Sequence, residues 1–193
     1  MMEQNHLLSP QQSDNAFKAV SYGKTLQKVI LLNYLTFGLY SFYWFYRNWK
    51  DFRGKIWLTD GPAAGLFTLG LIVPFLGIYL LYRQFSQINE YIPPEAAAPR
   101  TVAPLLLSLL WFSQAPLNRM SAKMDWPEPI ATLFILALST FVLASFQRNL
   151  NAYWQYEQPE SPLQNRFGWG EKICLGLGLL VWATFLVGVF FLS

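Results

Sequence analysis

Hydrophobic residues are gathered along this chain in long blocks that are separated by short polar segments. Five blocks contain no Asp, Glu, Lys, Arg or His: residues 29–46, 62–82, 101–118, 129–147 and 173–193. An α-helix needs roughly 20 apolar residues to cross a hydrocarbon core about 30 Å thick, and each block approaches or reaches that length. The pattern predicts an all-α, polytopic transmembrane bundle of four or five spans over residues 29–193, preceded by a polar N-terminal tail over residues 1–28.

Three of these blocks have features that bear on whether they cross fully. The first block has Gly38 near its middle, so it either spans the membrane or bends there as a re-entrant hairpin. The second block contains Pro74, which lacks a backbone N–H, and we expect a kink at that point. In the third block Pro104 and Pro116 bracket an apolar core of about a dozen residues, which predicts either a short span or an interfacial segment.

The distribution of lysine and arginine predicts the orientation, because cytoplasmic loops are enriched in both. With five crossings and a cytoplasmic N-terminus, eight of these residues lie inside and six outside. If the first block is a re-entrant hairpin, four spans remain and the counts become nine and five. Both counts favour a cytoplasmic N-terminus, and they leave the two topologies open.

Composition agrees with a membrane protein and limits its partners. Charged residues make up 13% of the chain and hydrophobic residues 53%, whereas ordinary soluble domains carry about 25% charged residues. The net charge is +3, but the cations are spread over tail and loops, where they suit anionic headgroups better than nucleic acid. The only cysteine, Cys174, and the only histidine, His6, allow no intrachain disulfide and no metal site built on histidine or thiolate groups.

The sequence lacks the motifs of familiar membrane chemistry. The five blocks carry no charged residue of the kind that marks a proton relay or ion pathway, and no His-Glu-x-x-His, G-x-S-x-G, P-loop or Cys-x-x-Cys spacing occurs. Six polar residues within the blocks offer two interpretations: a polar path for transport, for example past Asn33 and Thr68, or hydrogen bonds between helices or to their own backbone, which we expect. They are Asn33, Thr36, Thr68, Ser139, Thr140 and Thr184. We therefore expect no enzymatic activity, no cofactor and no metal.

Three blocks end in a related way, at residues 45–49, 81–85 and 146–150. Each ending has an aromatic residue within two positions before an arginine, an amide after the arginine, and then a bulky apolar residue. An internal repeat, which is common in small membrane bundles, explains the similarity. The aromatic belt and snorkelling cation that helices acquire at a membrane interface explain it equally well.

Residues 35–47 read Leu-Thr-Phe-Gly-Leu-Tyr-Ser-Phe-Tyr-Trp-Phe-Tyr-Arg. This segment resembles a small bacterial integral-membrane domain family of unknown function, in which a Thr-x-Gly-x-Tyr element leads into a Tyr-Trp pair and a basic residue. The likeness covers residues 28–55, with a weaker echo at 66–90. It implies a location in the bacterial cytoplasmic (inner) membrane and no known activity.

The basic, aromatic-rich stretch after the first block is the most suggestive chemical feature. Arginine offers a bidentate fork to phosphate, and tryptophan fixes depth at the interface, so contact with anionic lipid headgroups is one interpretation and ordinary membrane anchoring is the other. The candidate headgroup contacts are Arg47, Lys50, Arg53, Arg83 and Arg148. We predict a non-enzymatic structural or accessory component that packs with lipid, a membrane-protein partner or a second copy of itself. The alternatives are a small transporter or channel for a neutral or lipidic substrate and, third, an enzyme acting on lipids.

Overall fold

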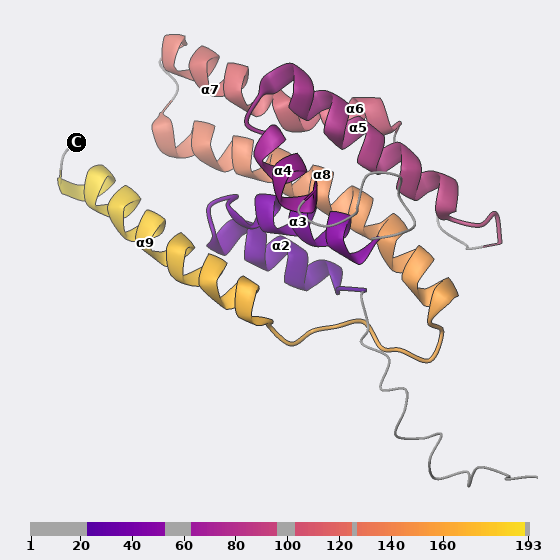
Figure 1. Ribbon diagram of the computed structural model, residues 1–193. Helices are drawn as coiled ribbons and strands as arrows, with labels where there is room; N and C mark the ends of the chain where they lie inside the picture. Colours follow the sequence, from indigo (N-terminus) through magenta and orange to yellow (C-terminus); the bar gives the residue numbers. More distant parts are fainter. Residues whose placement is uncertain (1–22, 53–62, 96–102, 125–126, 192–193) are drawn as a thin grey trace, which may run out of the picture.

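The computed structural model describes residues 23–52, 63–95, 103–124 and 127–191 (Figure 1). Within these ranges the secondary structure is helical, apart from an isolated β-bridge between Lys24 and Gln164. The helices are α2 (Leu26–Leu35), α3 (Tyr40–Asp51), α4 (Ala63–Gly70), α5 (Pro74–Tyr91), α6 (Pro104–Phe112), α7 (Gln114–Lys123), α8 (Glu128–Glu157) and α9 (Trp169–Phe191). The predicted all-α class is confirmed.

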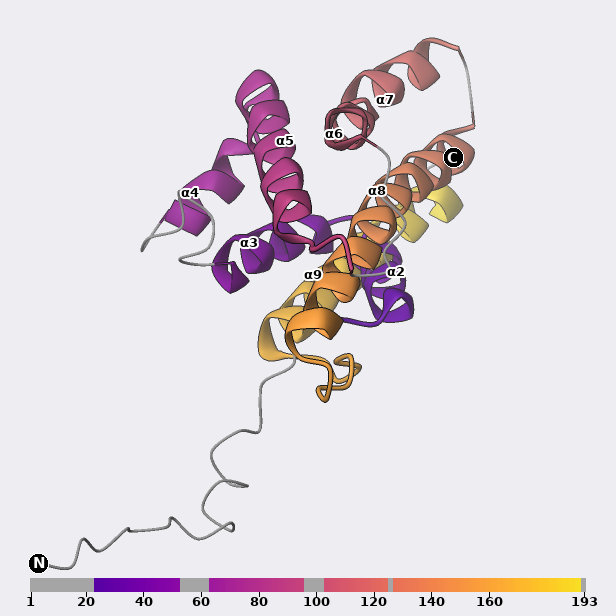
Figure 2. The same cartoon turned by 90° about the vertical axis from the view of Figure 1, so that its right-hand side faces the viewer.

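The 30-residue helix α8 organises the fold. Helices α2, α5, α6 and α7 pack against it, and α4 joins the bundle through α3 and α5. Helix α9 runs antiparallel to α8 in Figure 1 and contacts α2 and α3. In Figure 2, which shows the same arrangement from the side, α5 and the α6–α7 pair lie on the same side of α8, where α5 also packs against α6.

Two residues with positive φ divide the first hydrophobic block into α2 and α3. Phe37 has a φ of 54° and Gly38 a φ of 84°, a region that glycine enters without steric cost. The Gly38 N–H donates to the Asn33 carbonyl oxygen at 2.8 Å, and the Tyr40 N–H donates to Thr36 Oγ1 at 2.9 Å. The block is therefore a bent helical pair, which is the geometry that the re-entrant interpretation requires.

Pro74 produces a complete break in the second block, where a kink was expected. Helix α4 ends at Gly70, and α5 begins with Pro74 in its first turn. Proline is favoured at a helix start because its missing N–H would have no intrahelical partner there. Backbone N–H groups of residues 71–73 close the connection with bonds of 3.0–3.2 Å to carbonyl groups three residues earlier.

Among the described residues, two helical segments are long and apolar enough to cross a membrane, Pro129–Glu157 and Trp169–Gly188. The third block instead forms two short helices, α6 and α7, which meet at Ser113. Because the first two blocks are also divided, the prediction of four or five spans is not confirmed. The length and composition of the individual helices support two membrane spans.

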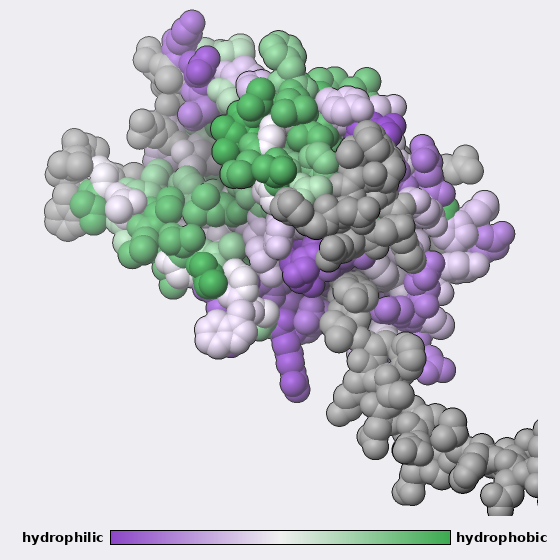
Figure 3. Space-filling view, viewed as in Figure 1, coloured by the Kyte–Doolittle hydropathy of each residue, from purple (hydrophilic) through white to green (hydrophobic). Residues whose placement is uncertain are grey.

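The interior and the surface have unusual compositions. Large aromatic side chains fill the core, and the ring centroids of Phe85 and Phe146 lie 4.1 Å apart. The surface carries large apolar side chains, among them Ile72 at 70% exposure and Phe75 at 88%. Figure 3 shows apolar surface over α9 and over α4 and the adjoining part of α5, with polar surface toward the other end of the molecule.

Candidate functional site

The three repeated helix endings meet at the centre of the fold through their buried positions. The amide residue that follows each arginine is buried in every ending: Asn48, Gln84 and Asn149. So is the bulky apolar residue after it: Trp49, Phe85 and Leu150. The Phe85 ring lies 6.2 Å from the Phe45 ring, and Gln84 Nε2 donates to the Phe45 carbonyl oxygen at 3.2 Å. The repeated pattern thus builds a shared core between α3, α5 and α8.

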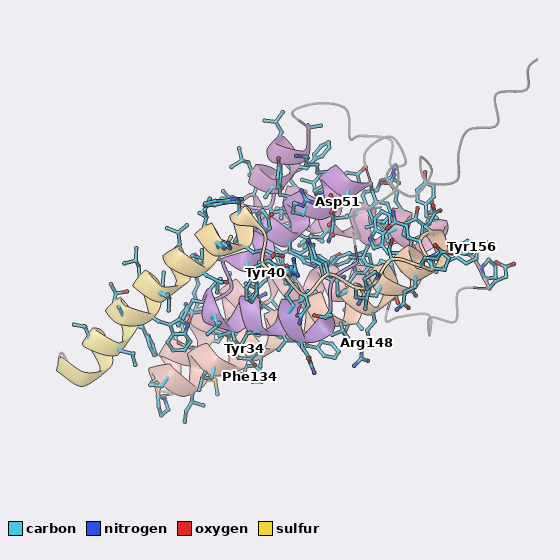
Figure 4. All side chains as sticks on the ribbon, turned by 90° about the horizontal axis from the view of Figure 1, so that it is seen from below. Tyr34, Tyr40, Asp51, Phe134, Arg148 and Tyr156 are labelled. Carbon is cyan, nitrogen blue, oxygen red and sulfur yellow. The ribbon has the colours of Figure 1, made fainter. Side chains whose placement is uncertain are left out.

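Among the described basic residues predicted to hold lipid headgroups, Arg47 and Arg148 do not lie together. Arg47 Nη2 pairs with Asp51 Oδ1 on the same helix at 3.1 Å, while Lys50 and Arg148 are exposed. Figure 4 places Asp51 and Arg148 on opposite sides of the molecule. Arg83 is half-buried, and Arg53 lies outside the described residues. The structure therefore brings together the aromatic and amide positions of the repeat, while Arg47 and Arg148 face different surroundings.

A buried ion pair joins the start of α2 to the start of α9. Lys28 Nζ lies 2.8 Å from Glu171 Oε2, and both side chains are almost fully buried. Lys28 Nζ also donates to the Arg166 carbonyl oxygen at 2.7 Å, and the Gly168 N–H, just before α9, donates to Glu171 Oε2 at 2.7 Å. Glu171 therefore caps its own helix and neutralises the lysine, which stabilises the long connection between α8 and α9.

Sequence reasoning missed this ion pair. Lys28 ends the polar segment predicted as a tail, and Glu171 lies in the polar segment between the fourth and fifth blocks, so neither stands out as a buried charge. Lys28 directly precedes the first block and Glu171 lies two residues before the fifth, but nothing in the sequence pairs these two charges with each other.

A second set of charges lies next to this pair. Lys24 is 5% exposed, and its backbone N–H donates to Asn151 Oδ1 of α8 at 3.2 Å. Burial lowers the pKa of Lys24 to about 8, although the negative charges of Asp51 and Glu171 oppose the shift. Burial also raises the pKa of Asp51, against the effect of the nearby Arg47 and Lys24 charges. The end of α3 thus lies close to the start of α2.

Hydrogen bonds between buried polar side chains hold other helices to α8. Asn33 Nδ2 of α2 donates to Ser139 Oγ at 2.9 Å and to Thr140 Oγ1 at 2.8 Å, as expected from the sequence. Trp44 Nε1 of α3 donates to Gln147 Oε1 at 2.7 Å. These contacts cross-link helices and account for the polar residues within apolar blocks.

The described residues contain no group of three or more His, Cys, Asp or Glu side chains placed to hold a metal ion. Comparisons with protein-family models, with curated proteins and with solved structures found no match for this chain. The resemblance over residues 28–55 therefore stays a prediction. The candidate site is therefore the charged, hydrogen-bonded end of the molecule, where the ends of several helices lie close together. The rest of the described surface is largely apolar.

Proposed function

We propose that this chain is a multi-pass integral membrane protein without enzymatic activity, a structural or accessory component that contacts anionic lipid or a membrane partner. The observation that carries the proposal is the outward-facing apolar surface of α4, α5 and α9 (Figure 3). Full burial of one large apolar side chain is worth about 1.5–3 kcal/mol. A surface with so many of them is stable in contact with hydrocarbon, whereas in water it favours aggregation.

The arrangement of helices supports a specific topology. Helices α6 and α7 together cover 20 residues from Pro104 to Lys123, which is about 30 Å of helix. We propose that this pair, α8 and α9 cross the bilayer, and that the bent pairs α2–α3 and α4–α5 enter it and return. Contacts between Lys28 and Glu171, and between Asn149 and Asn89, gather the helix ends on one side.

The basic residues support an orientation for this topology. Eight described lysine and arginine residues lie in the connections, at helix ends or in the half of a helix on the side of the Lys28–Glu171 pair: Lys24, Lys28, Arg47, Lys50, Arg83, Arg148, Arg166 and Lys172. Arg119 and Lys123 lie at the far end of α7. Cytoplasmic segments are enriched in such residues, so the larger group and the N-terminus are proposed to be cytoplasmic, in a bacterial inner membrane as the resemblance implies.

Two measurements test the membrane placement and its orientation. The full chain should remain in the membrane fraction after alkaline washing and require detergent for extraction. With Cys174→Ser as background, a membrane-impermeant maleimide should label Lys123→Cys in intact cells and Lys50→Cys after permeabilisation. A chain that stays monodisperse in buffer without detergent contradicts the proposal, and the reverse labelling pattern contradicts the orientation.

Anionic lipid contact is tested by removing exposed charge at the proposed cytoplasmic side. The double variant Lys50→Gln/Arg148→Gln should copurify with several-fold less phosphatidylglycerol, because each basic residue near a membrane surface contributes about 1 kcal/mol. The matched control is Arg119→Gln/Lys123→Gln at the other end of the bundle. Equal losses in the two variants contradict a specific cytoplasmic contact.

Transport of a neutral or lipidic substrate is the second candidate function. Two adjoining cavities, of about 400 and 340 Å³, lie beside Phe37 and Gly38 and favour it. A polar path through Asn33 and Thr68 is not supported, since Asn33 is hydrogen bonded to α8 and Thr68 Oγ1 donates to the Ala64 carbonyl oxygen at 2.8 Å.

A further inference from the structure

The α2–α3 turn forms one wall of two neighbouring cavities. The first, of about 400 Å³, lies between this turn, the start of α7 and the first three turns of α8. The second, of about 340 Å³, extends from the turn toward the α4–α5 connection and α6. They share Phe37, Gly38, Gln114, Ala115 and Ser139 as lining residues. Each volume falls within the range of small-molecule sites in proteins.

The two cavities differ in polarity. Asn118 and Thr132 line the first cavity but not the second. Gln114 Nε2 donates to the Trp111 carbonyl oxygen at 2.8 Å, which leaves the side-chain Oε1 available to accept a hydrogen bond. The second cavity adds an apolar wall that includes Leu71, Ile72 and Phe112. Ser41, Gln114 and Ser139 also line the second cavity, but most of its lining residues are apolar. The first cavity thus suits a hydrogen-bonding group better, and the second suits hydrocarbon better.

The charge of the lining limits the occupant. All lining residues of both cavities are described, and none of them is Asp, Glu, Lys, Arg or His. A charged headgroup would therefore lie there without a counter-ion in a region of low dielectric, which is costly. An uncharged head with a hydroxyl group can donate to Gln114 Oε1 and exchange hydrogen bonds with Thr132.

The positions of the two cavities along α8 predict how a bound molecule is oriented relative to the bilayer. The first cavity follows α8 from Thr132, close to the helix start, to Ser139, whereas the second cavity touches α8 only at Ser139. Ser139 lies 11 residues after Glu128, or about 16 Å along the axis. In a bilayer about 30 Å thick, the polar cavity is then closer to one interface and the apolar cavity to the midplane. The exposed Ile72, at 70% exposure, borders the apolar cavity and leaves it open toward lipid.

We propose that the two cavities together form a binding site for a single-chain, uncharged lipid with a hydroxyl-bearing head. The head lies between α7 and α8 at Gln114, Asn118 and Thr132. The hydrocarbon chain passes Phe37 and Gly38 and ends against α6 and the α4–α5 connection. This site rests on the membrane placement proposed above and assigns a ligand class to the lipidic-substrate alternative.

The test uses the full chain in nanodiscs and monooleoylglycerol with a photoreactive group at the end of its chain. Crosslinks mapped by mass spectrometry should fall on residues 71–74 and on Trp111 or Phe112. Ala115→Phe, which places a ring where the cavities adjoin, should reduce crosslinking at least tenfold. The matched control Ala183→Phe, on the exposed face of α9, should leave it unchanged.

A second variant and a competitor keep the test decisive. Thr132→Val retains the side-chain shape, removes the hydroxyl and should weaken binding several-fold even where Ala115→Phe does not fold. An oleoyl lysophosphatidylglycerol of the same chain length should compete poorly. Equal competition, crosslinks scattered over α9, or unchanged binding by Thr132→Val and Ala115→Phe overturns the site. A chain that integrates into membranes yet retains no probe overturns this proposal alone, whereas a chain that needs no detergent overturns the membrane placement as well.

Discussion

Helices α8 and α9 are both long and apolar, yet they are attached to the protein in different ways. Helix α8 lies at the centre and receives hydrogen bonds from Asn33 of α2 and Trp44 of α3. Helix α9 lies at the edge, with most of its surface exposed. It is fixed by the Lys28–Glu171 ion pair at its start, by close approaches at Gly170 and Gly178, and by the Trp182 Nε1–H, which donates to the Tyr34 carbonyl oxygen of α2 at 3.1 Å. By hydropathy both helices are candidates to cross a membrane. They differ in the polar and small residues through which each is attached to the rest of the protein.

Removal of the carboxylate at the start of α9 should have the largest effect. Glu171→Gln keeps the side-chain shape but removes the negative charge, so the buried Lys28 ammonium retains only uncharged partners, among them the Arg166 carbonyl oxygen and the Phe167 ring. Loss of one member of a buried pair costs about 3–5 kcal/mol. Thermal unfolding in detergent should show a large decrease in stability, whereas Glu160→Gln, at an exposed position, should behave as the wild type.

Removal of both charges of this pair tests the explanation. The double variant Lys28→Met/Glu171→Leu leaves no uncompensated ion, so it should recover much of the stability that Glu171→Gln loses. A double variant as unstable as the single one would mean that Glu171 acts mainly as the cap of α9.

Lys24, which lies just before α2 and contacts α8 near the Lys28–Glu171 pair, should make the free energy of unfolding depend on pH. Its folded pKa of about 8 is below the ordinary 10.5, so the unfolded chain binds more protons between these values, and the free energy of unfolding should rise with pH across that interval. The shift corresponds to at most about 3 kcal/mol. Denaturation midpoints from pH 7 to 10 measure this rise, which Lys24→Met should remove and Lys123→Met, at an exposed position, should retain.

Asp51 contributes in a different pH range. Its raised pKa means that the folded state holds a proton more tightly than the unfolded state. The associated stability is present below its ordinary pKa of 3.8 and is lost as pH rises through the raised value. The rise above pH 8 is therefore assigned to Lys24, and an unchanged rise in Lys24→Met would contradict that assignment.

The middle of α9 should respond to size. A Cβ at Gly178 would lie 2.3 Å from Thr36 Cα and 2.4 Å from the Leu35 carbonyl oxygen, and backbone atoms cannot move aside as a flexible side chain can. Gly178→Leu should separate α9 from the α2–α3 turn at a cost of about 1–3 kcal/mol. The matched control is Gly176→Leu, since nothing lies within 4 Å of a Cβ at that position. Similar losses in the two variants would show that α9 is not seated through Gly178.

Block patterns in the sequence predicted the helical class, hydrogen bonding by polar residues such as Asn33 within the blocks, and a disruption at Pro74. They did not predict how many blocks form continuous helices, because the bend at Phe37 and Gly38 depends on backbone conformations that several residues stabilise together. The Lys28–Glu171 pair joins residues 143 positions apart in sequence, and no local signal links them. The repeated endings were visible, but which side of each helix faces the core depends on packing among three helices.

The smallest effect is expected within α8 itself. Gln147 is 2% exposed; it accepts from Trp44 Nε1 at 2.7 Å and donates through Nε2 to Asn151 Oδ1 at 2.8 Å. Gln147→Leu leaves the indole N–H without this acceptor, at a cost of about 1–2 kcal/mol, since the new apolar group retains the packing. Gln155→Leu, at an exposed position of the same helix, controls for the change in composition.

Combining Gln147→Leu with Gly178→Leu shows whether the two attachments are independent. Gln147 holds α3 to α8, whereas Gly178 seats α9 against the α2–α3 turn from the other side. If the central and peripheral helices are attached separately, the losses in free energy of unfolding should add to within about 0.5 kcal/mol. If the double variant loses much less free energy of unfolding than the two single losses added together, the α2–α3 pair moves as one unit between α8 and α9. Releasing the pair from one of these helices then already releases it from the other.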